Sequence, residues 1–376
     1  MRPQSPWSQL HETQGSSIGG LLIKEELTSG TYYRTHAALR EADLQVVAAR
    51  IVKGFDGLPA SVKDAAFQEA ERWNALSHVN LAPLGNYFLH QDAIIFVGPP
   101  PPSLGAAPFA PAVLPLPRDA VALVGFQLAG ALVSVHGAGL VHRNVRPASL
   151  ALLAADGGAG APGTPEEAAA LLVGGCVKLG DHSGVLATAL CPSEGIALAY
   201  AAPEMLNDEP ATAKNDVWGF GATLLELATG HVVGDTQIAR KLLKRGNSKQ
   251  WTLEQSLRGA YATDSSRVLV GNAAQVAAWD ALPVPMRALI TDCLNLDAAD
   301  RPTAEQVLAH EAFAAPRSAQ VALQVQRARA TIVHNATLAL RAKQPMSAEA
   351  VLALVEASNA GPGVLDDTDV HAVCNL

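Results

Sequence analysis

The most constraining feature of the sequence is a long apolar stretch that ends abruptly in a basic segment. Leu123–Val141 is long and apolar enough to cross a bilayer, and His142-Arg143-Asn144-Val145-Arg146-Pro147 follows it directly. The stretch also contains Gln127, Ser134 and His136, together with several glycines. Polar side chains and glycines at this density favour a buried core helix, predicted at Asp119–His136, over a transmembrane helix.

The composition predicts a folded chain with a substantial core. Hydrophobic residues make up 49% of the 376 residues, which is ample for one large two-lobed domain or two ordinary ones and excludes disorder throughout. The net charge is −8, from 27 basic and 35 acidic side chains. Because nucleic-acid binding needs clustered Lys and Arg, we expect no nucleic-acid partner, and a basic protein partner is favoured.

The cysteines and the N-terminus bear on the compartment. The four cysteines, Cys176, Cys191, Cys293 and Cys374, form no Cys-x-x-Cys pair, so neither a zinc site nor a disulfide framework is predicted. The N-terminal residues lack a charged head followed by an apolar run, so a secretory signal is not expected, while a transit peptide stays open. We therefore expect an intracellular, cytoplasmic protein that does not insert into a membrane.

The basic segment after the apolar stretch resembles the catalytic loop of eukaryotic protein kinases, which reads His-Arg-Asp-Leu-Lys-Pro-x-x-Asn. The resemblance implies an α+β fold of two lobes, with a small β-rich N-lobe and a large α-helical C-lobe. Asn144 stands where the family has the aspartate that accepts the proton of the substrate hydroxyl, and an amide is not basic enough for that role. Arg146 replaces the lysine that steadies the transferred phosphoryl group, and Ser149 replaces a metal-binding asparagine.

The segment that would hold the nucleotide departs from the family in a similar way. Of the three glycines of the family's glycine-rich loop only Gly30 remains, with Thr28 and Tyr33 at the other two positions. Arg50 stands at the position of the nucleotide-binding lysine, where a planar fork replaces a compact ammonium. Glu69 is predicted to form an ion pair with Arg50; the alternative is a solvated carboxylate on an amphipathic helix.

The metal-binding motif is also altered. Val177-Lys178-Leu179-Gly180-Asp181-His182-Ser183 resembles the strand and Asp-Phe-Gly motif, and Asp181 is the single metal-binding carboxylate that the resemblance leaves. His182 is interpreted as a packed neutral histidine, and the alternative is a catalytic base. The prolines of Pro99–Pro102, at the position of the hinge, remove backbone donors for adenine. We expect no required cofactor, with ATP and Mg binding weak or lost.

The remaining motifs agree better with the family. Ala202-Pro203-Glu204 resembles the Ala-Pro-Glu motif, and Asp216-Val217-Trp218 resembles the start of the central helix. The resemblance implies that Asp216 holds the backbone of the catalytic loop, which contains His142 and Arg143, and that Arg301 pairs with Glu204 in the interior. These five residues are therefore assigned structural roles.

The sequence predicts the following division of the chain: a disordered arm at 1–17, the N-lobe at 18–97, the C-lobe at 98–316 with a disordered or loosely helical surface insertion at 154–170, and a helical tail at 317–376. The tail contains two expected helices, Arg317–Gln344 and Ser347–Ala360, and the first carries an apolar stripe that should dock on the large lobe or on a partner. Basic residues gather at 240–249, as a solvated helix face or as a docking site for an acidic partner.

Two functional hypotheses remain. The favoured one is a pseudokinase of the serine/threonine kinase family, acting as a scaffold or allosteric regulator through protein contacts, for which helices 317–360 are the candidate surface, with phosphoryl transfer lost or severely impaired. The alternative is an atypical but active ATP-dependent serine/threonine kinase. Fold alone does not decide between them.

Overall fold

The computed structural model describes residues 15–29, 33–82, 84–98, 113–153, 162–172, 175–180, 200–202, 204–205, 210–230, 273–295 and 297–319. Several predictions from the sequence concern residues outside these ranges: Gly30, Asp181, His182, the proline-rich hinge, the basic cluster at 240–249 and most of the tail. The chain divides into two compact units, Met1–Ala312 and Phe313–Leu376.

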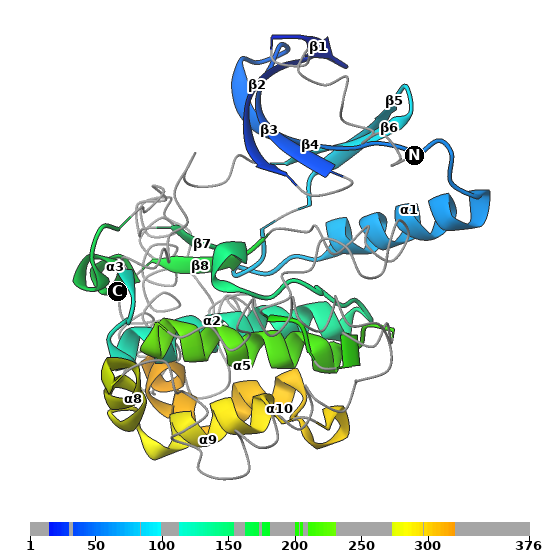
Figure 1. Cartoon of the computed structure of the whole chain (residues 1–376). Helices are drawn as coiled ribbons and strands as arrows, with labels where there is room; N and C mark the ends of the chain where they lie inside the picture. The colour runs from blue at the N-terminus through cyan, green and yellow to red at the C-terminus, as the bar shows by residue number, and fades with distance from the viewer. Residues whose placement is uncertain are drawn as a thin grey trace, which may run out of the picture. The chain divides into compact units, whose positions relative to one another are not determined.

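The N-terminal part of the first unit is a six-stranded antiparallel sheet with the order β1-β2-β3-β4-β6-β5 (Figure 1). Its strands are β1 (Ser17–Ile18), β2 (Leu21–Ser29), β3 (Tyr33–Arg40), β4 (Gln45–Val52), β5 (Asn86–His90) and β6 (Ala93–Gly98). Val47, Ala49 and Ile51 are buried at every second position of β4, because alternate side chains of a strand point to the same face. They form one core with β2 and β6.

Helix α1 (Ala60–Ala75) lies between β4 and β5 in the chain. Its buried side chains, Ala66, Glu69, Ala70 and Trp73, recur at helical spacing and define one face. Phe67 contacts the rings of Phe55 and Tyr87, at centroid distances of 5.3 and 5.5 Å, and so packs α1 on the sheet. One carboxylate, that of Glu69, therefore belongs to an otherwise apolar face.

The remaining described residues of the first unit are mainly helical and include one two-stranded sheet (Figure 1). Their elements are α2 (Arg118–Gly137), η3 (Pro147–Ser149), β7 (Leu150–Leu153), α3 (Pro165–Leu172), β8 (Cys176–Leu179), α5 (Ala213–Thr229), α8 (Ala273–Asp280), α9 (Val284–Cys293), η8 (Ala298–Asp300) and α10 (Ala304–Ala309); η9 (Glu311–Phe313) spans the boundary between the units.

Helix α5 is the centre of this part, since every residue from Asn215 to Thr229 is buried. A capping box between Thr212 and Asn215 begins the helix, and Gly230 ends it with a left-handed φ of 69°. Gly221 allows the close approach of α9: a Cβ at this position would lie 2.7 Å from the Cβ of Cys293. The helix is thus packed on all sides.

Helix α2 confirms the prediction of a buried core helix. It packs against α5, α10 and β8, and it is the single helix in the described ranges that is long and apolar enough to cross a membrane. The helix spans Arg118–Gly137, within one residue of the predicted Asp119–His136 at each end, and Gly139 beyond it adopts a left-handed φ of 67° that turns the chain. Leu140 is buried in the loop that follows.

Part of the predicted insertion is an ordered helix. Residues 165–172 form α3, and Ala168 and Leu172 on this helix are buried. It contacts α2 and β7. The low-complexity composition of 154–170 predicted a surface segment, but alanine and leucine at i and i+4 give this half an apolar face that packs on the domain.

Candidate functional site

The loop that begins at His142 is held by α5. Asp216, which is 1% exposed, accepts a hydrogen bond from the backbone N–H of His142 on one carboxylate oxygen and from that of Arg143 on the other, both at 2.7 Å. Its Oδ2 also lies 2.9 Å from Nε2 of His136. Arg143 has a positive φ of 68°. The two backbone hydrogen bonds to Asp216 stabilise this uncommon conformation of the loop.

His142 is fully buried, and the hydrogen-bond partners of its two ring nitrogens define the tautomer of the imidazole. Its Nδ1 accepts a hydrogen bond from the backbone N–H of Asn144 at 3.3 Å, and its Nε2 lies 2.8 Å from the carbonyl oxygen of Gly180. Nε2 therefore carries the proton and donates to this carbonyl, which makes the imidazole neutral. His142 thus links the loop to Gly180, which follows the last residue of β8 and precedes Asp181 in the chain.

Asn144 and Ser149 are brought together in the loop, and both are 3% exposed. The hydroxyl of Ser149 donates a hydrogen bond to the carbonyl oxygen of Asn144 at 2.6 Å. The backbone N–H of Ser149 donates to the carbonyl of Arg146, and the carbonyl of Ser149 accepts from Gly180. Ser149, at the position of the family's metal-binding asparagine, is therefore buried and bonded to the loop itself.

Arg50 is placed on β4 against β3. Its guanidinium carbon lies 5.2 Å from the centroid of the Tyr33 ring, and its Nε donates to the hydroxyl of Thr35 at 3.4 Å. Thr35 is the residue opposite Arg50 in the sheet register, and Tyr33 lies two residues away on the same face. Tyr33 and Arg50, which stand at positions where the family has a glycine and a lysine, thus form a cation–π pair.

The prediction that Glu69 pairs with Arg50 is wrong. Glu69 accepts a hydrogen bond from Arg143 Nη1 on Oε1 at 2.8 Å, and the two side chains are only 11% and 12% exposed. The reason is the orientation of α1, whose buried face meets the loop: the Trp73 ring packs edge-on against His142 at 5.9 Å. Burial raises the pKa of Glu69, and the charge of Arg143 opposes this shift.

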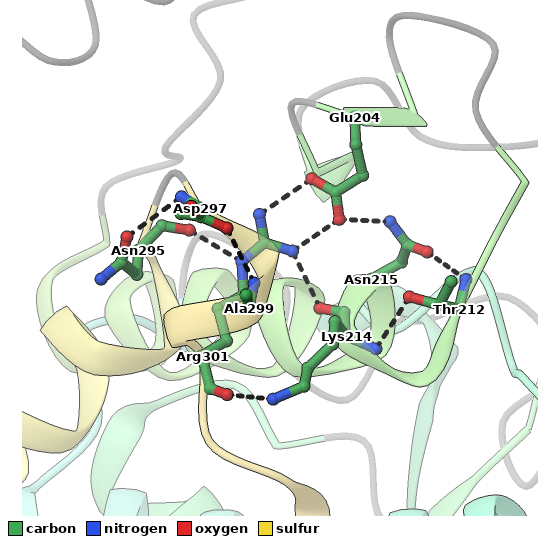
Figure 2. A network of polar contacts seen from close by, with 8 residues as sticks. All are labelled: Glu204, Thr212, Lys214, Asn215, Asn295, Asp297, Ala299 and Arg301. Atoms are coloured by element: carbon green, nitrogen blue, oxygen red, sulfur yellow. Dashed lines mark hydrogen bonds and ion pairs between the residues drawn. The ribbon is translucent and has the colours of Figure 1, made fainter.

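The structure brings Glu204 and Arg301 together in a buried network (Figure 2). Arg301, 1% exposed, donates from Nη1 and Nη2 to the two carboxylate oxygens of Glu204 at 2.6 and 2.8 Å. It also donates from Nε to the carbonyl of Asn295 at 2.7 Å and from Nη1 to that of Lys214 at 3.1 Å. The guanidinium lies 5.0 Å from the Trp218 ring centroid. This bidentate geometry is specific to arginine.

One hydrogen-bond network, formed by Asn80, Gln127 and Val177, was not assigned from the sequence. The amide of Asn80 donates to Gln127 Oε1 and to the carbonyl of Val177, each at 2.8 Å, and Gln127 Oε1 also accepts from the Val177 N–H at 2.7 Å. This network connects the turn after α1 to α2 and β8. Its signal in the sequence was Gln127, a polar side chain within an apolar stretch.

A second pair was also missed. Tyr200 donates a hydrogen bond from its hydroxyl to Oε2 of Glu226 at 2.5 Å. Glu226 is on α5 and is 7% exposed. Burial raises the pKa of both groups, and the hydrogen bond raises that of Tyr200 further while lowering that of Glu226. Tyr200 lies just before the Ala-Pro-Glu motif, but no sequence pattern indicates its partner.

The protein kinase domain family model matches residues 22–313, so the chain belongs to that family. The serine/threonine-protein kinase AfsK of Streptomyces griseus is 29% identical over 265 residues, which are 69% of this chain and 24% of that protein. The serine/threonine-protein kinase PknL of Mycobacterium tuberculosis is 34% identical over 132 residues, which are 33% of this chain and 28% of that protein. This chain thus spans about a quarter of the length of these relatives.

A solved structure agrees in fold. The crystal structure of Rad53 1–466 in complex with AMP-PNP superposes with a TM-score of 0.55 at 20% identity, over 78% of this chain and 65% of that chain. The predictions of a protein kinase-like family and of a bilobal α+β fold are confirmed.

Proposed function

We propose that this chain is a pseudokinase, a protein kinase domain that has lost phosphoryl transfer and acts as a scaffold or regulator through protein contacts. The observation that carries the proposal is the closed catalytic loop. Asn144 supplies an amide where a base is needed, and Ser149, which replaces the family's metal-binding asparagine, is buried with its hydroxyl bonded to the Asn144 carbonyl. Loss of a general base alone typically costs about 10²–10⁴-fold in rate.

The arrangement at Arg50 supports the same proposal. The guanidinium is stacked on Tyr33 and bonded to Thr35, and Glu69, its predicted partner, is engaged with Arg143. The side chain that should meet the nucleotide phosphates is therefore positioned by the sheet, and it differs in shape from an ammonium. ATP and Mg binding are accordingly proposed to be weak or absent.

The alternative is an active serine/threonine kinase, and it is favoured by one observation: AfsK and PknL, the relatives described above, are serine/threonine-protein kinases. Under that alternative, Asp181 would be the remaining metal ligand. We also propose that the chain binds a basic protein partner and that it acts inside the cell.

A phosphate-transfer assay separates the two functions. Purified full-length protein is incubated with labelled ATP and Mg²⁺, and with a generic basic protein substrate, beside an Asp181→Ala variant. We expect equal background incorporation in both proteins. Incorporation by the natural sequence that disappears in Asp181→Ala would establish the active kinase and refute the pseudokinase.

Nucleotide binding is measured separately. The melting temperature of the same protein is recorded with ATP, with and without Mg²⁺, because a ligand that binds only the folded state raises it. We expect no shift in either condition. An Arg50→Lys variant, which restores the residue of the family, serves as the control. A low-micromolar ATP affinity of the natural sequence, measured by calorimetry, would contradict the proposal.

A further inference from the structure

A histidine lies on the core face of the six-stranded sheet. His36 of β3 is 5% exposed and lies opposite Ala49 of β4 in the sheet register. Residues paired across neighbouring strands project to the same face, so His36 shares the face that forms the core. The buried side chains of this core are all apolar: Leu21, Ile23, Ala38, Val47, Ala49, Ile51, Ala93 and Ile95. His36 thus places a titratable ring in apolar surroundings.

The ring of His36 is hydrogen-bonded on one side. Its Nδ1 lies 3.4 Å from the carbonyl oxygen of Lys24 on β2, and because a carbonyl only accepts, Nδ1 carries the proton. Nε2 is buried and has no hydrogen-bond partner among the described residues. A proton on Nε2 would add a charge and a second donor to the core without an acceptor for either. The site therefore favours the neutral imidazole.

The charged side chains around His36 come from β2 and β3, whereas β4 and β6 contribute apolar side chains to this face. Glu26 of β2 lies opposite His36 in the register, is 37% exposed, and accepts a hydrogen bond from Arg34 of β3 at 3.1 Å. Burial lowers the pKa of His36, while the carbonyl of Lys24 and the charge of Glu26 oppose this shift and the charge of Arg34 adds to it. Glu26 is thus a carboxylate at the surface edge of this core.

Strand β2 is irregular beside His36. Its register with β3 shifts between Ile23 and Glu26, and shifts again between Glu26 and Thr28. A bulge leaves residues outside the ladder of hydrogen bonds, so the pairing is weaker at that point. Lys24, whose carbonyl accepts from His36, lies within the first shift. The hydrogen bond from the ring therefore ties the irregular part of β2 to the core.

We propose that His36 is a pH-sensitive switch that holds β2 on β3 while its ring is neutral and releases β2 when the ring takes a proton from the solvent. The protonated ring leaves the core and pairs with Glu26, so the hydrogen bond to the carbonyl of Lys24 is lost. Residues 21–29 then separate from β3, the strand on which Tyr33 stacks with Arg50. The switch does not depend on whether the protein transfers phosphate.

The pH range of the switch follows from the direction of the pKa shift. Because the folded state holds the pKa of His36 below its ordinary value of 6.5, the stability contributed by the neutral ring is fully present above pH 6.5. This stability is lost as the pH falls from 6.5 through the pKa of the folded state. The switch therefore acts on the acid side of neutral pH.

Hydrogen exchange of the full-length protein, read peptide by peptide, tests the switch. The rates at about pH 5.5 and about pH 7.5 are each divided by the intrinsic rates of the same unfolded peptides, which removes the ordinary pH dependence of exchange. We expect the protection of residues 21–29 to fall about tenfold at the lower pH, since one pKa unit corresponds to a factor of ten, and that of α5 to stay unchanged.

Two variants remove the titrating ring. His36→Gln keeps an amide donor for the carbonyl of Lys24, and His36→Leu places an apolar side chain in the core. We expect both to protect residues 21–29 equally at the two pH values, so the result does not depend on how one new side chain packs. His90→Gln, on β5 of the same sheet, is the matched control and should keep the pH response of the natural sequence.

Glu26→Gln tests the partner of the protonated ring. We expect a smaller loss of protection at the lower pH, because the imidazolium then has no carboxylate to pair with at the surface. A response as large as that of the natural sequence would overturn the movement of the ring toward Glu26. Equal protection of residues 21–29 at both pH values in the natural sequence, an equal loss in α5, or an undiminished response in either His36 variant would overturn the switch itself.

Discussion

Substitution of Arg301 by alanine tests the buried network in the large lobe most directly. The guanidinium makes two hydrogen bonds to Glu204 at 2.6 and 2.8 Å, and two more to the backbone carbonyls of Asn295 and Lys214. Its side chain is fully buried, whereas that of Glu204 is 14% exposed. Arg301→Ala therefore removes the charge that compensates a mostly buried carboxylate and also removes donors to two carbonyl groups.

The magnitude follows from this burial. Removing one partner of a buried ion pair costs about 3–5 kcal/mol, and a domain has a total unfolding free energy of about 5–15 kcal/mol. The loss is at the upper end because the space left beside the Trp218 ring, now 5.0 Å from the guanidinium carbon, would be a cavity. Arg301→Ala should thus remove a third or more of the stability.

Urea denaturation followed by tryptophan fluorescence measures the effect, with soluble yield as a second readout. Arg287→Ala is the control: its guanidinium is 34% exposed and lies 3.9 Å from Asp280, so its loss should cost about 0–1 kcal/mol. If Arg301→Ala and Arg287→Ala have the same denaturation midpoint, the assignment of a stabilising network to Arg301 is wrong.

Two further predictions concern α5. Gly221→Ala should lower the unfolding free energy by about 1–3 kcal/mol, because the new methyl group would collide with Cys293; Gly137→Ala, with no atom within 4 Å of the new Cβ, is the control for thermal melting, and equal melting would contradict the packing argument. Burial raises the pKa of Glu226 above its ordinary value of 4.5, because the folded state favours the protonated carboxyl. The stability gained from this protonated form is fully present below pH 4.5 and is lost as the pH rises through the pKa of the folded state. Glu226→Gln, which keeps an acceptor for Tyr200, should remove this loss, and an unchanged pH profile of the melting temperature would refute the reasoning.

The family and the fold were predictable because the residues that define them are local in sequence. The catalytic-loop pattern, the Ala-Pro-Glu motif and the start of α5 are each read from a few adjacent residues. The buried helix α2 was predictable from its composition, and both of its ends lie within one residue of the predicted Asp119–His136.

The contacts of the candidate site were less predictable, because each depends on how separate elements are placed. Glu69 was assigned to Arg50 from the spacing of the family, but a side chain on α1 reaches whichever cation its face of the helix meets, and this is Arg143. The bond from Ser149 to the Asn144 carbonyl depends on the path of the loop. No pattern in the sequence specifies such a bond, since a serine hydroxyl has many possible acceptors.

The pairing of Glu204 with Arg301 has a consequence for how the chain acquires its structure. The two residues are 97 positions apart, so the carboxylate leaves the ribosome well before the guanidinium that neutralises it. During synthesis, Glu204 and the carbonyl of Lys214 at the start of α5 therefore lack the hydrogen bonds from Arg301 until the segment from Asn295 to Arg301 has been made. A chain interrupted before Arg301 would contain nearly all of the apolar core and none of this closing contact, so the incomplete product is the form in which aggregation would be expected.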